Sequence, residues 1–175
     1  LATNINAGQF SNGSGLTSVV VNNATLGAAE SLTLTQTIDT LDTINVGATT
    51  AMTLAVGATL TASSAVIDEL LSDESGSRLT LDTQNITANE AITVDQANDL
   101  GATTNGKITA TIDTNETVTE LATLAADGGT NDLTITIRAA DATAATALQL
   151  NTINAATAVA VNLTNVTALA ASVLS

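Results

Sequence analysis

The side chains in this sequence that could bind a metal ion are carboxylates, and several lie close together. Ca²⁺ requires several oxygen ligands converging at short range, and two carboxylates four residues apart on a helix repel each other unless a cation lies between them. Asp95 and Asp99 have this spacing, as do Glu116 and Glu120. A third group comprises Asp68, Glu69, Asp73 and Glu74. A solvated acidic face explains the same residues, and we favour that interpretation, so we assign no metal ligand.

A glycine-containing turn is a second candidate for calcium. Residues 127–133, Asp-Gly-Gly-Thr-Asn-Asp-Leu, are similar to the calcium-binding nonapeptide GGxGxDxUx. The match lacks the third glycine and occurs once. Because successive turns of such repeats share their ions, one degenerate copy supplies few ligands. We therefore expect a solvated turn and no cofactor, with calcium as the alternative.

The composition excludes most catalytic chemistry. The 175 residues include no Cys and no His, which removes thiol nucleophiles, disulfides, imidazole ligands and the Ser-His-Asp triad. Arg78, Lys107 and Arg138 are the only bases against 17 acids, a net charge of −14. Three scattered bases form neither a catalytic cluster nor a nucleic-acid-binding surface. We predict that the protein is not an enzyme and has no catalytic or cofactor-binding residues.

Neither a membrane span nor a leader is expected. The apolar stretches are interrupted by Thr, Asn and Asp, so none is long enough to cross a bilayer. No basic segment followed by an apolar stretch opens the chain, so we expect no signal peptide. Hydrophobic residues make up 45% of the chain but aromatic residues only 1%, which predicts a thin, aliphatic and elongated core.

Short segments rich in β-branched residues recur along the chain and predict strands. Several alternate apolar residues with Thr, the period-2 pattern of a strand. They lie at residues 18–21, 52–56, 78–82, 107–112, 133–137 and 158–161. The last four recur at intervals of about 25 to 29 residues, a period typical of solenoids.

A second recurring motif predicts helix N-termini between these strands. Thr-x-x-Gln or Thr-x-x-Glu before an apolar segment is the capping box. It begins at Thr33, Thr93, Thr117 and Thr146. Together with the apolar spacing in 62–73 and in the C-terminal tail, it predicts helices near residues 34–45, 62–73, 94–102, 118–126, 143–156 and 167–174.

Alternating strands and helices predict an α/β fold, a right-handed solenoid of about six strand–helix repeats with one parallel sheet. An all-β solenoid is the alternative, because Thr, Val and Ile are mediocre helix formers. Residues 1–17 are expected to be a partial repeat or linker, and residues 18–175 a single elongated domain. Alternate residues of two of these strands should face the core, namely Ile108, Ala110, Ile112, Leu133, Ile135 and Ile137. Thr109, Thr111, Thr134 and Thr136 should lie on the opposite face. A threonine file there resembles those of ice-binding solenoids, but Arg138 follows it and Val159 and Val161 end it. We therefore interpret these threonines as strand formers.

Three segments of the sequence resemble motifs in the tandem repeats of giant bacterial surface proteins. Residues 92–100 (ITVDQANDL) and 108–121 (ITATIDTNETVTEL) are similar to the phrase ITVAQAxxL of these repeats. Residues 148–157 (LQLNTINAAT), followed by VAVN at 159–162, are similar to DLNxIDAATxVAVNA. The repeats occur in cyanobacterial and proteobacterial adhesin-like, calcium-associated and surface-layer-like proteins. The resemblance covers roughly residues 30–167 and implies an extracellular scaffold or adhesin without catalytic residues.

These observations together favour a structural module of a secreted bacterial cell-surface protein. It would act as an adhesin stalk, a surface-layer component or a filament building block. The partners expected are further copies or further repeats of the same polypeptide, bound end to end, and not nucleic acid. A calcium- or glycan-binding adhesive module is the alternative.

Overall fold

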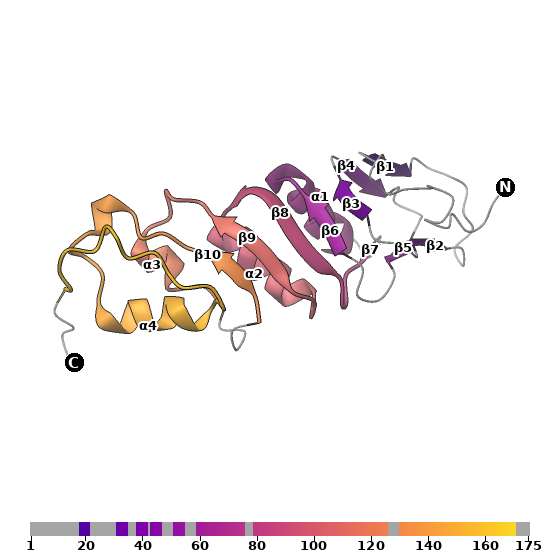
Figure 1. Ribbon diagram of the computed structural model, residues 1–175. Coiled ribbons are helices and arrows are strands. Elements are labelled where there is room, and N and C mark those ends of the chain that lie inside the picture. Colours follow the sequence, from indigo (N-terminus) through magenta and orange to yellow (C-terminus); the bar gives the residue numbers. More distant parts are fainter. Residues whose placement is uncertain are drawn as a thin grey trace. The chain divides into compact units, whose positions relative to one another are not determined.

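The structure is a computed structural model in which the described residues are 18–21, 31–34, 38–41, 43–46, 51–54, 59–75, 79–125 and 130–170 (Figure 1). The predicted linker at residues 1–17 lies outside them. By its contacts the chain divides into two compact units. Unit 1 comprises residues 1–90 and 102–107, and unit 2 comprises residues 91–101 and 108–175.

The first six strands form three parallel sheets. They are β1 (Ser18–Val21), β2 (Ser31–Leu34), β3 (Ile38–Leu41), β4 (Thr43–Val46), β5 (Ala51–Leu54) and β6 (Thr59–Ala62). Each of the first three strands pairs in parallel with the third strand after it, β1 with β4, β2 with β5 and β3 with β6. Three consecutive strands therefore belong to three different sheets. All six are short and contain β-branched or other aliphatic residues, which favour a pleated backbone.

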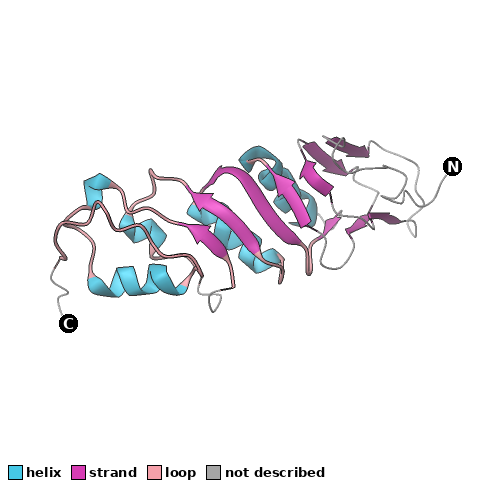
Figure 2. Ribbon diagram, viewed as in Figure 1, coloured by secondary structure: helices cyan, strands magenta, loops and turns pink. Residues whose placement is uncertain are grey.

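After β6, helices alternate with the strands (Figure 2). The elements are α1 (Ser64–Ser75), β7 (Leu79–Thr80), β8 (Asn85–Ile92), α2 (Val94–Thr103), β9 (Ile108–Ile112), α3 (Val118–Leu121), β10 (Asp132–Thr134), the 3₁₀ helix η3 (Ala139–Asp141) and α4 (Ala147–Ala155). Strand β7 joins the sheet β2-β5-β7, while the largest sheet has the order β10-β9-β8-β6-β3. The protein is thus α/β, with a parallel sheet whose strands β6, β8, β9 and β10 alternate with helices.

Paired strands are separated by similar lengths of chain. The shortest separation is that of Ser31 and its partner Ala51, and the longest is that of Met52 and its partner Leu79. The other strand pairs fall between these limits. We call the chain from a residue to its partner on the next paired strand a round. Parallel strands require such a return of the chain before each new pairing.

The core of each unit is aliphatic. In unit 1 the buried residues include Leu60, Ile67 and Leu70, and in unit 2 they include Ile92, Ile108 and Ile137. The predicted inward positions are confirmed, because Ile108, Ala110, Ile112, Leu133, Ile135 and Ile137 are all at least 95% buried. Thr111 and Thr134, between them in sequence, are exposed. The alternation of Ile and Thr therefore fixes which face of β9 and β10 packs inward.

The helix predicted at residues 34–45 is wrong. This part of the chain contains β3 and β4, and Thr33, the expected cap, lies inside β2 opposite Thr53. Gln36 lies outside the described residues. The β-branched side chains of Thr37, Ile38 and Thr40 favour an extended backbone, and strand pairing outweighed the capping motif. Strands β2, β6 and β8 were not predicted.

The prediction of one sheet for the strand segments that follow residues 18–21 is also wrong. Strands β5 and β7, which correspond to the segments 52–56 and 78–82, pair in the separate three-stranded sheet. No strand forms at residues 158–161. The next residue, Asn162, makes an isolated parallel bridge with Thr136. Val159 donates its amide to the Thr157 hydroxyl at 3.1 Å, which accounts for a bend there. Residues 167–170 are not helical, and the rest of the predicted last helix lies outside the described residues.

The helices predicted near 62–73, 94–102 and 143–156 are confirmed as α1, α2 and α4, with shifted bounds for α1 and α4. The fourth, predicted at 118–126, ends early as α3. Its start is nevertheless where the capping motif placed it.

Candidate functional site

Three helices begin with the predicted capping box. For α2, Gln96 donates its backbone amide to the Thr93 hydroxyl at 3.1 Å, and its side-chain oxygen accepts from the Thr93 amide at 3.0 Å. The same reciprocal pair joins Thr117 with Glu120 at α3 and Thr146 with Gln149 at α4. Each box satisfies donors that the first helical turn leaves without a partner inside the helix.

A carboxylate from the following round binds the first helical amide of α2 and of α3. Val94 donates its amide to Glu116 Oε1 at 3.1 Å, across 22 residues of sequence. Val118 donates its amide to Asp141 Oδ2 at 2.8 Å, across 23 residues. An anion at a helix N-terminus is stabilised by the helix dipole as well as by the hydrogen bond. These contacts connect successive rounds, whereas the capping boxes act within one round.

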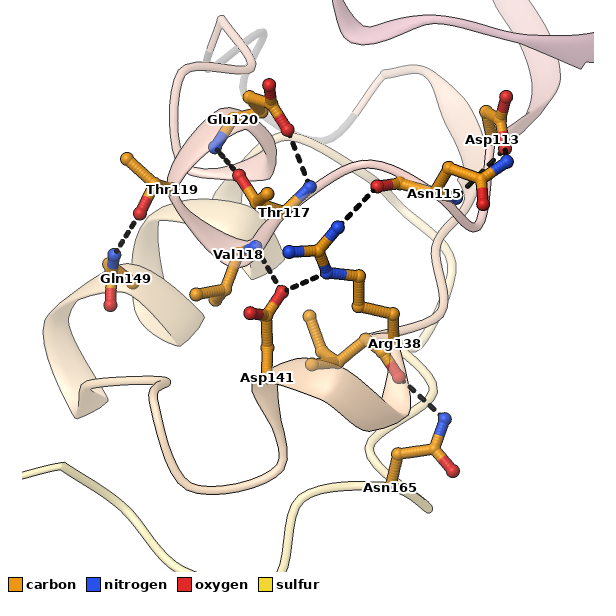
Figure 3. A network of polar contacts seen from close by, with 11 residues as sticks. Asp113, Asn115, Thr117, Val118, Thr119, Glu120, Arg138, Asp141, Gln149 and Asn165 are labelled. Carbon is orange, nitrogen blue, oxygen red and sulfur yellow. Dashed lines mark hydrogen bonds and ion pairs between the residues drawn. The ribbon is translucent and has the colours of Figure 1, made fainter.

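Arg138 extends the connection at Asp141 into a network (Figure 3). Its Nε donates to Asp141 Oδ2 at 2.8 Å, and the two side chains are 32% and 11% exposed. Its Nη1 donates to the Asn115 carbonyl, also at 2.8 Å. Asn115 in turn donates both its backbone amide and its side-chain amide to Asp113 Oδ1 at 2.9 Å. Arg138 therefore ties the turn after β9 to the 3₁₀ helix of the next round.

Buried polar side chains join the ends of the rounds. In unit 2, Ile108 donates its amide to Asn131 Oδ1 at 2.7 Å, and Leu133 donates its amide to the Thr157 hydroxyl at 2.9 Å. In unit 1, the Thr104 hydroxyl donates to the Gln84 carbonyl at 2.8 Å. Asn131, Thr157 and Thr104 are each at least 91% buried. A buried polar group costs free energy unless it is paired, so these contacts restrict which residues can pair across rounds.

The pKa of the Glu120 carboxyl lies below the ordinary glutamate value. Its hydrogen bonds from the Thr117 backbone amide and the Thr117 hydroxyl lower its pKa, and Arg138 and Glu116 act in the same direction. The carboxyl group is fully exposed, so solvent screens these effects. Ionisation of Glu120 strengthens the hydrogen bond that its carboxylate accepts from the Thr117 amide.

The structure gives several of the predicted metal-binding candidates other roles. Glu116 and Glu120, considered as a calcium pair, cap α2 and α3 instead. Asp95 and Asp99 are exposed on α2. Asn131 of the glycine-containing turn is buried and bound to Ile108, while residues 127–129 lie outside the described part of the chain. Within the described residues, no group of three or more carboxylates could hold a metal ion.

The roles of Glu116 and Asp141 were not recognised from the sequence. The available signal was their position relative to the capping threonines, since Glu116 follows Thr93 at nearly the same interval as Asp141 follows Thr117. An alignment of the rounds on their capping boxes places these two acids together. Arg138 and Thr157 have no comparable sequence pattern.

The described helices include none long and apolar enough to cross a membrane. No family model, curated protein or solved structure matches this chain.

Proposed function

We propose that this chain is a structural module, a right-handed solenoid of strand–helix repeats that forms a stalk, an adhesin segment or a building block of a surface layer or filament outside a bacterial cell. The observation that carries the proposal is the similar spacing of parallel strand partners, from that of Ser31 and Ala51 to that of Met52 and Leu79. A chain that pairs each round with the next in one direction winds as a solenoid, and parallel crossovers are right-handed in nearly all proteins.

The polar contacts support a mechanical role for the module. The carboxylates of Glu116 and Asp141 and the buried side chains of Asn131 and Thr157 bind backbone groups of the preceding round. Such contacts resist sliding of one round past another, because a slip leaves buried polar groups unpaired. The extracellular location rests on the resemblance to tandem repeats of surface proteins and on a composition that is acidic and contains no Cys.

Deletion of one whole round tests the solenoid architecture. Removing residues 93–116 joins Ile92 directly to Thr117, so that the capping box of α3 takes the place of the box of α2. We expect this variant to keep a folded far-UV circular dichroism spectrum and a cooperative melting transition. A matched deletion of half a round, residues 93–104, should unfold the protein. Loss of folding in both variants would contradict the solenoid.

The location and the alternative function need separate measurements. Antibodies against the purified chain should label intact cells of the organism that makes it, and labelling only after permeabilisation would refute an extracellular role. Titration calorimetry with Ca²⁺ tests the adhesive alternative, which predicts saturable binding with a defined stoichiometry.

A further inference from the structure

The triplet Asn-x-Ser/Thr, the acceptor sequence for N-linked sugars, occurs six times in this chain. The triplets begin at Asn12, Asn23, Asn85, Asn115, Asn162 and Asn165. A chain rich in Asn and Thr contains such triplets by chance, so the sequence alone does not select among them. The last four lie within the described residues, and their surroundings differ.

Two of these four triplets are held by contacts between rounds. Asn85 is half-buried in β8, its Oδ1 accepts from the Lys107 amide at 2.8 Å, and the next residue, Ile86, is fully buried. Asn165 is also half-buried, and its Nδ2 donates to the Ile137 carbonyl at 2.7 Å. An enzyme that transfers a sugar cannot bind either triplet without breaking these contacts.

The triplet at Asn115 is used by the local fold. Asn115 donates Nδ2 to Asp113 Oδ1 at 2.9 Å. The middle residue, Glu116, binds the first helical amide of α2, and the hydroxyl of the last, Thr117, accepts from the Glu120 amide at 3.1 Å. A transferase reaches this hydroxyl only by opening the capping box of α3.

The triplet at Asn162 is exposed at all three of its residues. Thr164 donates its hydroxyl to Asn162 Oδ1 at 2.8 Å and its backbone amide to the same oxygen at 3.0 Å. Because a backbone amide can only donate, the atom that faces it is the oxygen, and Nδ2 points away from Thr164. Within the described part of the chain this Nδ2 has no hydrogen-bond partner.

The exposure of this triplet follows from its place in the round. Thr111 lies opposite Thr134 across β9 and β10, and Thr136 lies opposite Asn162. Continued by two residues, this register places Asp113 at the same position of an earlier round. Like Asn162, Asp113 accepts on Oδ1 from the backbone amide two residues later. Asp113 is only half-buried and residues 114–115 are exposed, although β9 lies between β8 and β10, so a round on each side leaves this turn at the surface.

We propose that Asn162 is the acceptor of an N-linked sugar, transferred to its Nδ2 from a sugar diphosphate. Nδ2 forms a bond to the anomeric carbon, the bond from that carbon to the diphosphate oxygen breaks, and the diphosphate leaves with the electron pair. Nδ2 gives up one proton to a basic group of the transferase. The inference goes beyond the proposed structural role and does not depend on it.

The contacts of Thr164 favour this step. An amide nitrogen is a poor nucleophile because its lone pair is delocalised onto the oxygen. The two hydrogen bonds to Asn162 Oδ1 stabilise the negative charge that loss of the Nδ2 proton leaves on the amide, since they are donors already directed at the atom where charge develops. A sugar on Nδ2 leaves both hydrogen bonds intact.

Mass spectrometry of the chain purified from the organism that makes it tests the proposal. Trypsin cleaves after Arg138, the last basic residue, so Asn162 and Asn165 are released in one peptide. We expect this peptide to carry the mass of one or more sugar residues, and fragmentation to place them on Asn162. A peptide without sugar, or a sugar on Asn165 alone, would overturn the proposal.

Variants produced in the same organism test the role of the hydroxyl. Asn162→Gln and Thr164→Val should lose the sugar completely, whereas Thr164→Ser, which retains a hydroxyl, should keep it. Asn165→Gln is the matched control and should also keep it; where this variant alters the circular dichroism spectrum, Thr167→Val removes the same triplet. A sugar retained on Thr164→Val, with an unchanged circular dichroism spectrum, would overturn the assigned geometry.

Two sources of the sugar diphosphate are distinguished with the unmodified recombinant chain. One reaction contains the soluble extract of the organism and nucleoside diphosphate sugars, and the other contains its membrane fraction and polyprenyl diphosphate-linked sugars. Transfer to Asn162 in either reaction supports the proposal and identifies the donor. Transfer in neither would contradict a sugar diphosphate as the donor.

Discussion

Replacing Asp141 tests whether carboxylates from one round hold the helix of the round before. The Asp141 side chain is 11% exposed and accepts two hydrogen bonds on Oδ2, from the Val118 amide and from Arg138 Nε, both at 2.8 Å. A hydrogen bond to a charged group contributes about 1.5–3 kcal/mol. The Arg138 side chain is 32% exposed, so water replaces part of its lost contact. We therefore expect Asp141→Ala to lower the free energy of unfolding by about 2–4 kcal/mol.

The conservative variant separates the hydrogen bond from the charge. Asp141→Asn retains an oxygen that can accept from the Val118 amide, so its cost should be about 1 kcal/mol. Urea unfolding followed by far-UV circular dichroism measures both, since the chain has no Trp or Tyr for fluorescence. Glu90→Gln, at an exposed position of β8, is the control and should stay within about 0.5 kcal/mol of the parent. Equal losses for Asp141→Asn and Asp141→Ala, or losses no larger than the control's, would refute the reasoning.

Three further outcomes are expected from the same unfolding measurements. Thr117→Ala removes the hydroxyl that caps α3 and should cost about 0.5–2 kcal/mol, more than Thr119→Ala; the opposite order would mean that the box does not hold the helix. Ile135→Ala should cost about 2–5 kcal/mol because Ile135 is fully buried, while Thr134→Ala, on the exposed face, should be near neutral, and equal losses would show that both faces are buried. Because folding lowers the pKa of Glu120, its contribution is complete above the ordinary glutamate pKa of about 4.3 and disappears as the pH falls through the lowered value. Thr117→Ala should therefore lose part of its effect in acid, while the part that comes from the lost acceptor of the Glu120 backbone amide remains; an undiminished effect there would contradict this assignment.

The sequence was most informative where a local pattern and the strand pairing agree. The capping boxes at Thr93 and Thr117 predicted two helix starts correctly, because each satisfies its donors with residues three positions apart. The box at Thr146 also starts a helix, but α4 begins at Ala147, four residues later than predicted. The alternation of Ile and Thr in β9 predicted its buried face. The box at Thr33 has the same pattern, but there the β-branched residues that follow belong to strands that pair with a strand three elements away, and no local signal reports such a pairing.

The contacts between rounds were unpredictable for the same reason. Asp141 is one of 17 acids, and nothing in the residues beside it indicates that its partner is the amide of Val118, 23 residues earlier. Asn131 was interpreted as part of a solvated turn, yet it is buried and holds the first residue of β9. A polar residue that acts across rounds is recognised from the sequence only after the rounds themselves have been aligned.

The shortness of α3 explains why the rounds need contacts of both kinds. A helix of four residues does not form alone, since nucleation fixes several residues before hydrogen bonds compensate. Helix α3 has its first turn held by the Thr117 box from its own round and by Asp141 from the next. Its stability therefore depends on the round that follows, as that of α2 depends on Glu116. Such nearest-neighbour dependence couples the unfolding of adjacent rounds, so loss of the round containing Asp141 should expose α3 to hydrogen exchange before α2.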